Sequence, residues 1–373
     1  MRGLNLRWCR HMQPFVPHEL PIKNLDWTKF VSLIGKANRE LAKFDSLLNG
    51  IPEPNILLSP LTTNEAVLSS RIEGTQATLE DVYKFEASPN EKTSRYEDIQ
   101  EIINYRRAIT EASEKLNKLP LSNRLIREIH KTLLSGTRGE DKTPGNFRTG
   151  QVYIGQVGKD IESAAFVPPE PQTIPEHFSN FEKYIHYNEK DVLVQLAIVH
   201  AQFEIIHPFW DGNGRTGRII MPLFLYYKNI LSSPNFYLSE YFEKNRNSYN
   251  SGLNSISKTG RWENWIAYFL NAIIVQSAIN RKKVESILTL YRDMMNNIQN
   301  ITHSQYTHKV VEFIFSNPWF DTIRFREHSG IPKTAALRIL RILAESGILK
   351  LSRKGSGRKP SLYIFPELLK IVM

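Results

Sequence analysis

The chain has 373 residues with 41% hydrophobic and 11% aromatic content, which is enough for two or three packed domains and excludes a disordered protein. Its single cysteine, Cys9, excludes an intramolecular disulfide and a thiolate metal cluster, and no apolar run approaches a membrane span, so we expect a cytoplasmic protein with no membrane partner. The formal net charge is +10, and +7 of it lies in the last 70 residues, where twelve Lys and Arg residues stand against five Asp and Glu residues.

The N-terminal region is predicted to be helical. Apolar residues recur at helical spacing over residues 27–48, and the glycine and prolines of residues 50–54 end that helix. A second helix is expected to begin at Thr62, because Thr62 and Glu65 have the spacing of a capping box. It is expected to end at Gly74, a residue suited to the left-handed conformation that follows many helices.

The middle of the chain continues in the same way. Helical periodicity recurs at residues 99–109, 125–133, 192–206 and 262–295, so the body of the protein is expected to be mainly α-helical. Alternating side chains at residues 150–155 predict a short strand, with Phe166 and Val167 as its partner in a hairpin.

Residues 207–218 read HPFWDGNGRTGR and predict an anion-binding turn at the start of a helix. Gly212 and Gly214 allow a sharp turn that exposes backbone N–H groups, and the helix that follows directs its positive end to the same place. Arg215 and Arg218 lie three residues apart on this helix, so both guanidiniums are expected to reach one elongated anion. The Gly-x-Gly-x-x-Gly spacing also matches a dinucleotide fingerprint, but a helical pattern rather than a strand precedes it.

Two residues beside these glycines are candidates for metal binding and for proton transfer. Asp211 is a hard oxygen ligand that is well placed to hold Mg²⁺ next to bound phosphates. His207, at the end of the preceding helix, is able to accept a proton at neutral pH. A lone histidine or an Asp-Gly-Asn-Gly turn is usually structural, but their joint occurrence with the two arginines favours a phosphate-handling site.

This segment resembles the signature of the Fic family, HPFx[DE]GNGRxxR, at every specified position. The resemblance implies transfer of AMP from ATP to a Ser, Thr or Tyr hydroxyl of a protein substrate or of the enzyme itself, with pyrophosphate leaving. It implies that His207 is the general base, that Asp211 binds Mg²⁺ and that Arg218 contacts the γ-phosphate. The other residues that it assigns to nucleotide binding are Gly212, Asn213, Gly214, Arg215, Thr216 and Gly217.

The upstream segment at residues 69–74, SSRIEG, resembles the inhibitory motif [ST]xxxE[GN] of the same family, with Ser69, Glu73 and Gly74 at the specified positions. Helical spacing places Ser69 and Glu73 on one face, so the serine is expected to orient the glutamate. A carboxylate that pairs with Arg218 competes with the γ-phosphate for the same guanidinium. We therefore expect Glu73 to inhibit the enzyme in cis.

Two further segments resemble the family. Residues 146–155 are similar to the flap that docks the target, with Val152, Tyr153 and Ile154 as docking residues, although an ordinary hairpin explains the same pattern. Tyr249 resembles the tyrosine near the adenine, although a tyrosine in a helix is commonly part of the core.

The basic C-terminal region resembles a winged helix-turn-helix. Three helices are expected at residues 306–315, 322–329 and 332–346, and a hairpin follows with strands at residues 348–352 and 362–365. The basic residues of the third helix and of the wing are Lys333, Arg338, Arg341, Arg353, Lys354, Arg358 and Lys359. Contact with DNA and docking or dimerisation with a protein remain equally good interpretations of this surface.

The expected fold is mainly α: a Fic-type helical bundle with a short β-hairpin flap and a C-terminal winged helix-turn-helix domain. We divide the chain into an N-terminal helical region at residues 1–110, a catalytic core at 111–295 and a winged-helix domain at 304–373, with the asparagine-rich residues 295–303 as the boundary. The alternative to an adenylyltransferase is a nucleotide-sensing, DNA-binding transcriptional regulator without transfer activity. Aromatic residues in the long helices are compatible with a homodimer and equally with core packing.

Overall fold

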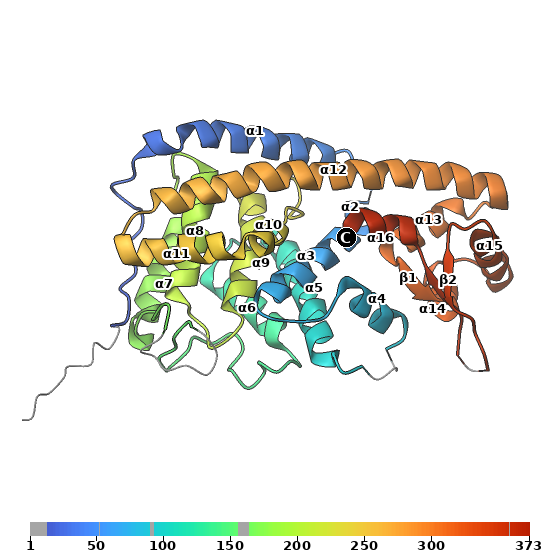
Figure 1. Cartoon of the computed structure of the whole chain (residues 1–373), viewed down its shortest axis with the longest axis horizontal. Coiled ribbons are helices and arrows are strands. Elements are labelled where there is room, and N and C mark those ends of the chain that lie inside the picture. The colour runs from blue at the N-terminus through green and yellow to red at the C-terminus, as the bar shows by residue number, and fades with distance from the viewer. Residues whose placement is uncertain (1–12, 52, 90–92, 156–163, 358) are drawn as a thin grey trace, which may run out of the picture.

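A computed structural model describes residues 13–51, 53–89, 93–155, 164–357 and 359–373, and it is mainly α-helical (Figure 1). The first group of elements is η1 (Trp27–Lys29), α1 (Val31–Leu48), α2 (Pro54–Leu57), α3 (Ser59–Ile72), α4 (Leu79–Ala87) and α5 (Tyr96–Leu116). The second group is α6 (Asn123–Leu134), η3 (Pro171–Thr173), α7 (Ile174–Ile185), α8 (Val192–Ile206), α9 (Asn213–Tyr227), α10 (Ser239–Lys244) and α11 (Arg246–Thr259).

The remaining elements form the C-terminal part of the chain. They are α12 (Glu263–Thr302), α13 (Thr307–Ser316), β1 (Trp319–Asp321), α14 (Thr322–His328), α15 (Lys333–Glu345), β2 (Lys350–Arg353), β3 (Leu362–Ile364) and α16 (Pro366–Val372). The helices α13, α14 and α15 and the β2–β3 hairpin lie within one or two residues of their expected positions, whereas α12 is longer than expected and β1 and α16 were not expected from the sequence.

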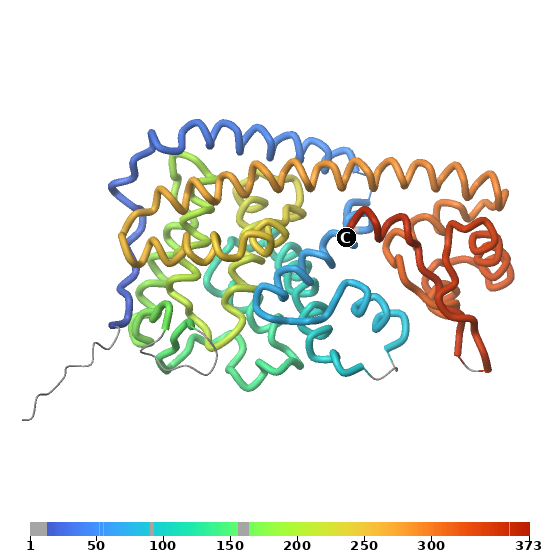
Figure 2. The backbone as a smooth tube through the Cα atoms, viewed as in Figure 1, coloured from blue at the N-terminus to red at the C-terminus, as the bar shows by residue number. Residues whose placement is uncertain are grey.

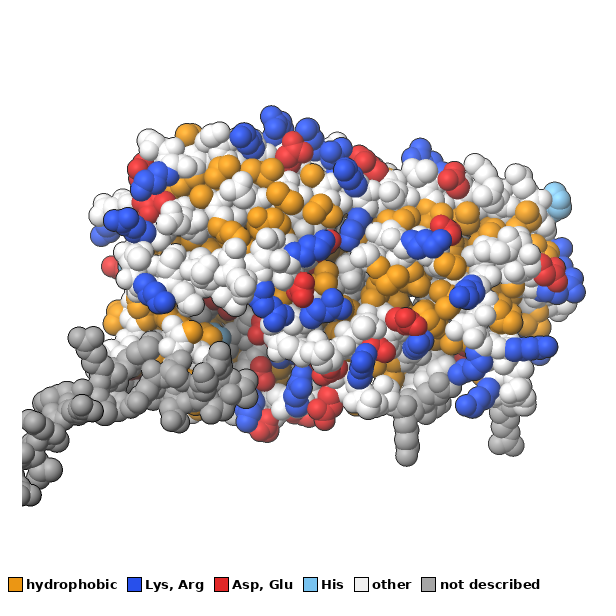
Figure 3. All heavy atoms as spheres, viewed as in Figure 1, with side chains coloured by type: hydrophobic (Ala, Val, Ile, Leu, Met, Phe, Trp, Pro, Cys, Tyr) orange, Lys and Arg blue, Asp and Glu red, His pale blue; other side chains and the backbone are white. Residues whose placement is uncertain are grey.

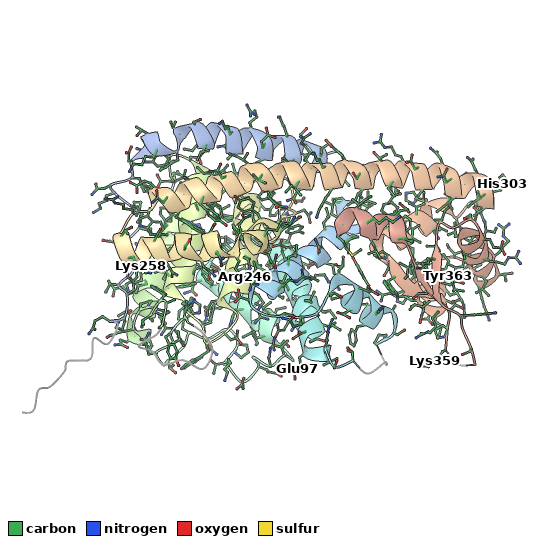
Figure 4. The ribbon with its side chains drawn as sticks, viewed as in Figure 1. Glu97, Arg246, Lys258, His303, Lys359 and Tyr363 are labelled. Atoms are coloured by element: carbon green, nitrogen blue, oxygen red, sulfur yellow. The ribbon has the colours of Figure 1, made fainter. Side chains whose placement is uncertain are left out.

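Two helices that are far apart in the sequence form one edge of the molecule. The 40-residue helix α12 packs along α1, and Figure 2 shows it continuing past α1 toward the C-terminal elements. There it contacts α13, α15 and α16. The asparagine-rich stretch that we expected to be a domain boundary is therefore the last part of a helix, which ends only at His303, labelled at the far end of α12 in Figure 4.

The centre of the bundle is the pair α8 and α9. Asp191 caps α8 by accepting hydrogen bonds from the N–H groups of Leu193 and Val194, and nearly every residue of the helix is buried. The two helices approach closely at Gly217, where an added Cβ atom would lie 2.5 Å from Oε1 of Glu204 and 3.1 Å from Cδ1 of Phe203. A larger residue would therefore displace the Glu204 side chain from this crossing.

Helix α3 begins earlier than the sequence indicated. It starts at Ser59 with a proline in its first turn, whereas the expected start at Thr62 was wrong. Thr62 donates instead to the Leu58 carbonyl, and the buried Glu65 accepts hydrogen bonds from the backbone and hydroxyl of Ser239. The expected end is confirmed, because Gly74 follows the helix with a φ of +100°.

The C-terminal strands form one antiparallel sheet in the order β1-β3-β2. Tyr363 on β3, labelled in Figure 4, pairs with Phe320 on one side and with Leu351 on the other. The expected flap hairpin is reduced, among the described residues, to one bridge between Ile154 and Phe166. In the described parts of the chain, no helix is both long enough and apolar enough to cross a membrane.

Trp265 provides a test of the core. It is fully buried on α12, and its indole N–H donates to the Ala197 carbonyl of α8 at 2.8 Å. Trp265→Ala should lower the free energy of unfolding by about 3–5 kcal/mol, because it leaves a large cavity between the two helices. Val275→Ala, on the exposed side of the same helix, should change it by less than about 0.5 kcal/mol. Equal urea midpoints for the two variants would contradict the packing described here.

Candidate functional site

The loop between α8 and α9 is held in an unusual backbone shape. His207 ends α8 in a left-handed conformation with a φ of +48°, and Gly212 precedes α9 with a φ of +73°. The Asn213 side chain braces the loop, since it accepts from the Phe209 N–H at 2.9 Å and donates to the Phe209 carbonyl at 2.8 Å. The loop is therefore fixed by its own side chains.

His130 of α6 packs against the loop between α8 and α9. Its ring stacks on Phe209 with the centroids 3.7 Å apart. Nδ1 accepts a hydrogen bond from the Gly145 N–H at 2.8 Å, so Nε2 must carry the proton that it donates to the Asp211 carbonyl at 2.9 Å. Burial lowers the pKa of His130 to about 4, which keeps this arrangement neutral.

His207 has the opposite tautomer. Its Nδ1 lies 3.3 Å from the Glu204 carbonyl, and only a protonated nitrogen is able to donate to that oxygen. The other nitrogen, Nε2, is therefore left with a free lone pair. Burial, with a contribution from the charge of Arg148, lowers the pKa of His207 to about 4. A neutral imidazole at physiological pH is able to accept a proton.

A pocket of about 940 Å³ opens beside this imidazole. The predicted site residues that line it are Glu73, Tyr153, Ile154, His207, Asp211, Gly214, Arg218 and Tyr249. The backbone N–H groups of the first turn of α9 face the start of the helix, because the first intrahelical donor is Thr216, whose N–H bonds to the Gly212 carbonyl at 3.0 Å. This end of α9 is suited to an anion.

A carboxylate of the same chain lies at that helix end. Glu73 accepts from Nη2 of Arg218 at 2.5 Å, and a methyl group at position 214 would overlap its Oε1 atom. Burial raises the pKa of Glu73, but the charge and hydrogen bond of Arg218 more than offset this, so the net pKa lies below its usual value. The pair is therefore ionised at neutral pH.

The serine of the upstream motif contacts the arginine rather than the glutamate. The Ser69 hydroxyl accepts from Nε of Arg218 at 2.8 Å, and the Ser69 carbonyl accepts from Nη2 at 3.1 Å. Arg218 is about 1% exposed, so three groups from α3 and its C-terminal end hold its guanidinium. Ser69 thus positions Arg218, in contrast to the expected orientation of Glu73.

Arg215 is not among the residues that line the pocket. Its guanidinium pairs with the buried Glu101 of α5 at 2.8 Å and with Asp211 at 3.3 Å. Glu101 is itself held by Nε of Arg138 at 2.8 Å. The expected convergence of Arg215 and Arg218 on one anion is not found, because a buried carboxylate on α5 attracts the first guanidinium. Arg215 instead helps to orient Asp211.

Three more predicted residues have clear local roles. The Thr216 hydroxyl donates to the Gly212 carbonyl at 2.8 Å and so stabilises the first turn of α9, and Gly217 lies at the crossing with α8. The Tyr249 hydroxyl contacts Nε2 of His200 at 2.9 Å, and Tyr249 lines the pocket.

Arg246, which is labelled in Figure 4 and was not predicted as a site residue, donates to the Arg71 carbonyl at 2.6 Å and so connects α11 to α3.

The flap residues lie at the mouth of the pocket. Ile154 and Phe166 exchange two backbone hydrogen bonds at 2.8 and 3.1 Å. Tyr153 is 48% exposed and Ile154 is 38% exposed, whereas Val152 is half-buried. Residues 156–163 lie outside the described residues.

Four residues of the site were not found by sequence reasoning: Glu101, His130, Arg148 and Glu204. For Glu101, His130 and Glu204 the available signal was a charged or polar residue inside an apolar helical pattern, since such residues are rarely buried without a partner. Arg148 lies outside the helices, and no local pattern indicated it. Glu204 lies on the pocket wall, and burial raises its pKa to about 7.

Comparison with known proteins identifies similar domains. Residues 31–114 match the model described as Fic/DOC family N-terminal, and residues 120–225 match the model described as Fic/DOC family. A probable protein adenylyltransferase from Aquifex aeolicus is 28% identical over 179 residues, which are 47% of this chain and 51% of that protein. Protein adenylyltransferase Fic from Drosophila melanogaster is 29% identical over 109 residues, which are 28% of this chain and 20% of that protein. The matches thus span about half or less of these relatives.

Solved structures support the fold. A crystal structure of a Fic family protein from Desulfovibrio desulfuricans has a TM-score of 0.57 at 17% identity, and the match covers 95% of this chain and 98% of that chain. A Fic domain containing signalling protein from Bacteroides thetaiotaomicron has a TM-score of 0.54 at 15% identity and covers 67% of this chain and 97% of that chain. At these identities the similarity shows the fold alone.

His130 of α6 and His207 of the loop offer a direct test of the site. Nitrogen NMR of the labelled protein should show His207 protonated on Nδ1 and His130 protonated on Nε2, both neutral at pH 6, because both pKa values are lowered to about 4 by burial. Titration of either ring near pH 6.5, or one shared tautomer, would contradict this geometry.

Proposed function

The chain contains both domains of the Fic/DOC family, at residues 31–114 and 120–225, and we propose that it is a protein adenylyltransferase that moves AMP from ATP to a Ser, Thr or Tyr hydroxyl of a protein. One observation carries the proposal. The free lone pair of His207 Nε2, the Asp211 carboxylate and the positive end of α9 lie in one pocket. Transfer to an α-phosphorus needs a base, charge neutralisation and positioning, and it needs no protein nucleophile.

The reaction then follows from the pocket. The triphosphate of ATP lies over the first turn of α9 near Gly214, with its far end at Arg218. Nε2 of His207 accepts the proton of the target hydroxyl, whose oxygen forms a bond to the α-phosphorus. The bond from that phosphorus to the bridging oxygen breaks, pyrophosphate leaves with the electron pair, and the imidazolium later returns its proton to solvent.

The donor set at Asp211 fits Mg²⁺. Its side chain is 46% exposed, and Oδ1 is oriented by the Gly212 N–H and by Arg215. Among the described residues, no group of three His, Cys, Asp or Glu side chains is arranged for a metal. A single carboxylate together with phosphate oxygens is the usual magnesium site of nucleotide enzymes. When bound, Mg²⁺ would neutralise phosphate charge, and Asp211 would hold it.

We further propose that Glu73 restrains the enzyme in cis. Its carboxylate lies at the anion-binding end of α9 and holds the guanidinium that the γ-phosphate would need. A phosphate and a carboxylate cannot both occupy that position, because their charges repel. The target is expected to dock at the flap, where the exposed Tyr153 and Ile154 lie beside the pocket.

A second function is proposed for the C-terminal region. The order of α13, β1, α14, α15 and the β2–β3 hairpin supports assignment as a winged helix-turn-helix, with α15 as the recognition helix. Lys333, Arg341 and Lys354 are exposed on α15 and the hairpin, and Figure 3 shows basic side chains over this end of the molecule. DNA binding would make the chain a regulator as well as an enzyme. Without transfer activity, it would be a nucleotide-sensing regulator alone.

Glu73→Gly should raise self-modification and target modification by about 5- to 150-fold, the range that intramolecular coupling energies allow. The measurement is incorporation of labelled AMP from ATP and Mg²⁺, with the mass increase located by mass spectrometry. Glu73→Gln, which keeps the shape but removes the charge, should give an intermediate rate.

His207→Ala is the control in the Glu73→Gly background. It should keep ATP binding and lose transfer, because it removes the base but not the anion site. Retained transfer would refute the role of His207, and an unchanged rate in Glu73→Gly would refute inhibition in cis.

The C-terminal proposal is tested by gel shift with a duplex DNA probe. Binding should weaken steeply as salt rises, because phosphate contacts release counterions. Arg341→Glu, a change at a residue that is 72% exposed on α15, should weaken binding, whereas Lys43→Glu on the exposed face of α1 should not. No shift of the probe at low salt would favour a protein-docking role.

A further inference from the structure

Arg148 lies at the junction of three segments of the site. It follows Asn146 and Phe147 at the start of the flap segment, residues 146–155, and it is about 1% exposed. Its guanidinium donates three hydrogen bonds to carbonyl oxygens: Nε to His207 at 2.9 Å, Nη1 to Gly150 at 3.0 Å and Nη2 to Pro169 at 2.6 Å. Its backbone N–H also donates to the Pro208 carbonyl at 2.9 Å.

These partners lie where the flap meets the loop between α8 and α9, which we call the catalytic loop. Gly150 lies just before the exposed flap residues, and Pro169 lies just after Phe166, with which the flap pairs. His207 is the residue whose left-handed backbone turns the chain out of α8. A non-glycine residue in this conformation carries a strain of order 1 kcal/mol or more, so the surrounding structure must hold it.

The charge of Arg148 is unusual in this setting. Among the described residues no carboxylate forms an ion pair with it, and burial lowers its pKa to about 10. A buried cation without a counter-ion costs several kcal/mol unless dipoles replace water, and here three carbonyl dipoles do so. A neutral side chain would avoid this cost. We therefore attribute to the planar guanidinium a role that depends on reaching three carbonyl oxygens at once.

We infer that Arg148 is a positioning residue for the reaction proposed above: it fixes the backbone of His207 and joins both sides of the flap to the catalytic loop. His207 and the flap residues Tyr153 and Ile154 are thereby held at a fixed distance from each other, so a target docked on the flap presents its hydroxyl to Nε2. The inference rests on the proposed function for its chemistry and on the three hydrogen bonds for its geometry.

The same charge acts on the imidazole. It adds to burial in lowering the pKa of His207, so the ring stays neutral although the charges of Glu73 and Asp211 raise that pKa.

Two substitutions separate the effect of the hydrogen bonds of Arg148 from the effect of its charge. Arg148→Lys keeps the charge, but a compact ammonium has no planar fork to reach three divergent carbonyls. Arg148→Met removes both while keeping a long apolar stem.

The test compares Arg148→Met and Arg148→Lys in the Glu73→Gly background by self-modification with labelled ATP. Arg148→Met should lower kcat by about 100-fold with little change in KM for ATP, because misplacement of the base affects chemistry and not phosphate binding. The acidic limb of its pH–rate profile should also shift to higher pH than in the parent, because loss of the cation raises the pKa of His207. Arg148→Lys should lose rate without that change of pH profile.

Arg324→Met is the matched control. Arg324 also donates to a carbonyl, that of Glu86 at 2.5 Å, but it lies on α14 and no hydrogen bond joins it to His207 or to the flap. Its kcat should stay close to that of the parent. Equal kcat values for Arg148→Met and the parent would overturn the inference, as would a loss in Arg148→Met that is entirely a rise in KM.

A second readout separates this inference from the proposed function. Histidine NMR of full-length Arg148→Met should show changed chemical shifts and a raised pKa for His207, whether or not the protein transfers AMP. If the parent has no activity but the His207 signals change in this way, the proposed reaction fails while the positioning role stands. Unchanged His207 signals in a folded Arg148→Met protein would refute it, and if that variant does not fold, the kcat of Arg148→Lys decides.

Discussion

The buried guanidinium of Arg218 is the group around which the two halves of the bundle are arranged. It lies on the central helix α9, and its hydrogen-bond partners Ser69 and Glu73 come from α3 and its end. Arg218 is almost fully buried and is paired with Glu73, and removing one partner of such a buried ion pair without replacement costs about 3–5 kcal/mol. Either Glu73 or an external anion must therefore pair with Arg218. The end of α3 and an anion in the pocket thus compete for the same guanidinium.

The loop before α9 shows how a site is organised before a substrate arrives. Two neutral histidines with opposite tautomers, His130 and His207, have different tasks: the first anchors the Asp211 backbone, and the second lines the pocket and keeps a lone pair on Nε2. Neither task tolerates a doubly protonated ring, and burial keeps both rings neutral. The Asn213 amide adds a third fixed point. Little reorganisation is then needed when charge develops during a reaction.

The sequence was most informative where a function depends on local spacing. Helical periodicity located most of the helices, and the HPFWDGNGRTGR segment placed His207, Asp211 and Arg218 in one pocket. It failed where a distant residue decides the outcome. Arg215 turns toward Glu101, a carboxylate more than a hundred residues earlier, and no local pattern reports that pair. The strand β1 and the helix α16 were missed for the same reason, since a three-residue strand and a seven-residue helix depend on tertiary packing rather than on propensity.

The length of α12 has a mechanical consequence. At 1.5 Å per residue, its 40 residues extend over about 60 Å without a break, from the Trp265 contact in the core to the Arg338 contact on α15. A single continuous helix resists bending far better than a flexible linker. The two ends of the protein are therefore kept at a set spacing, as by a strut, so a macromolecule that bound to the basic end would be presented to the rest of the protein at a constant distance and in one orientation.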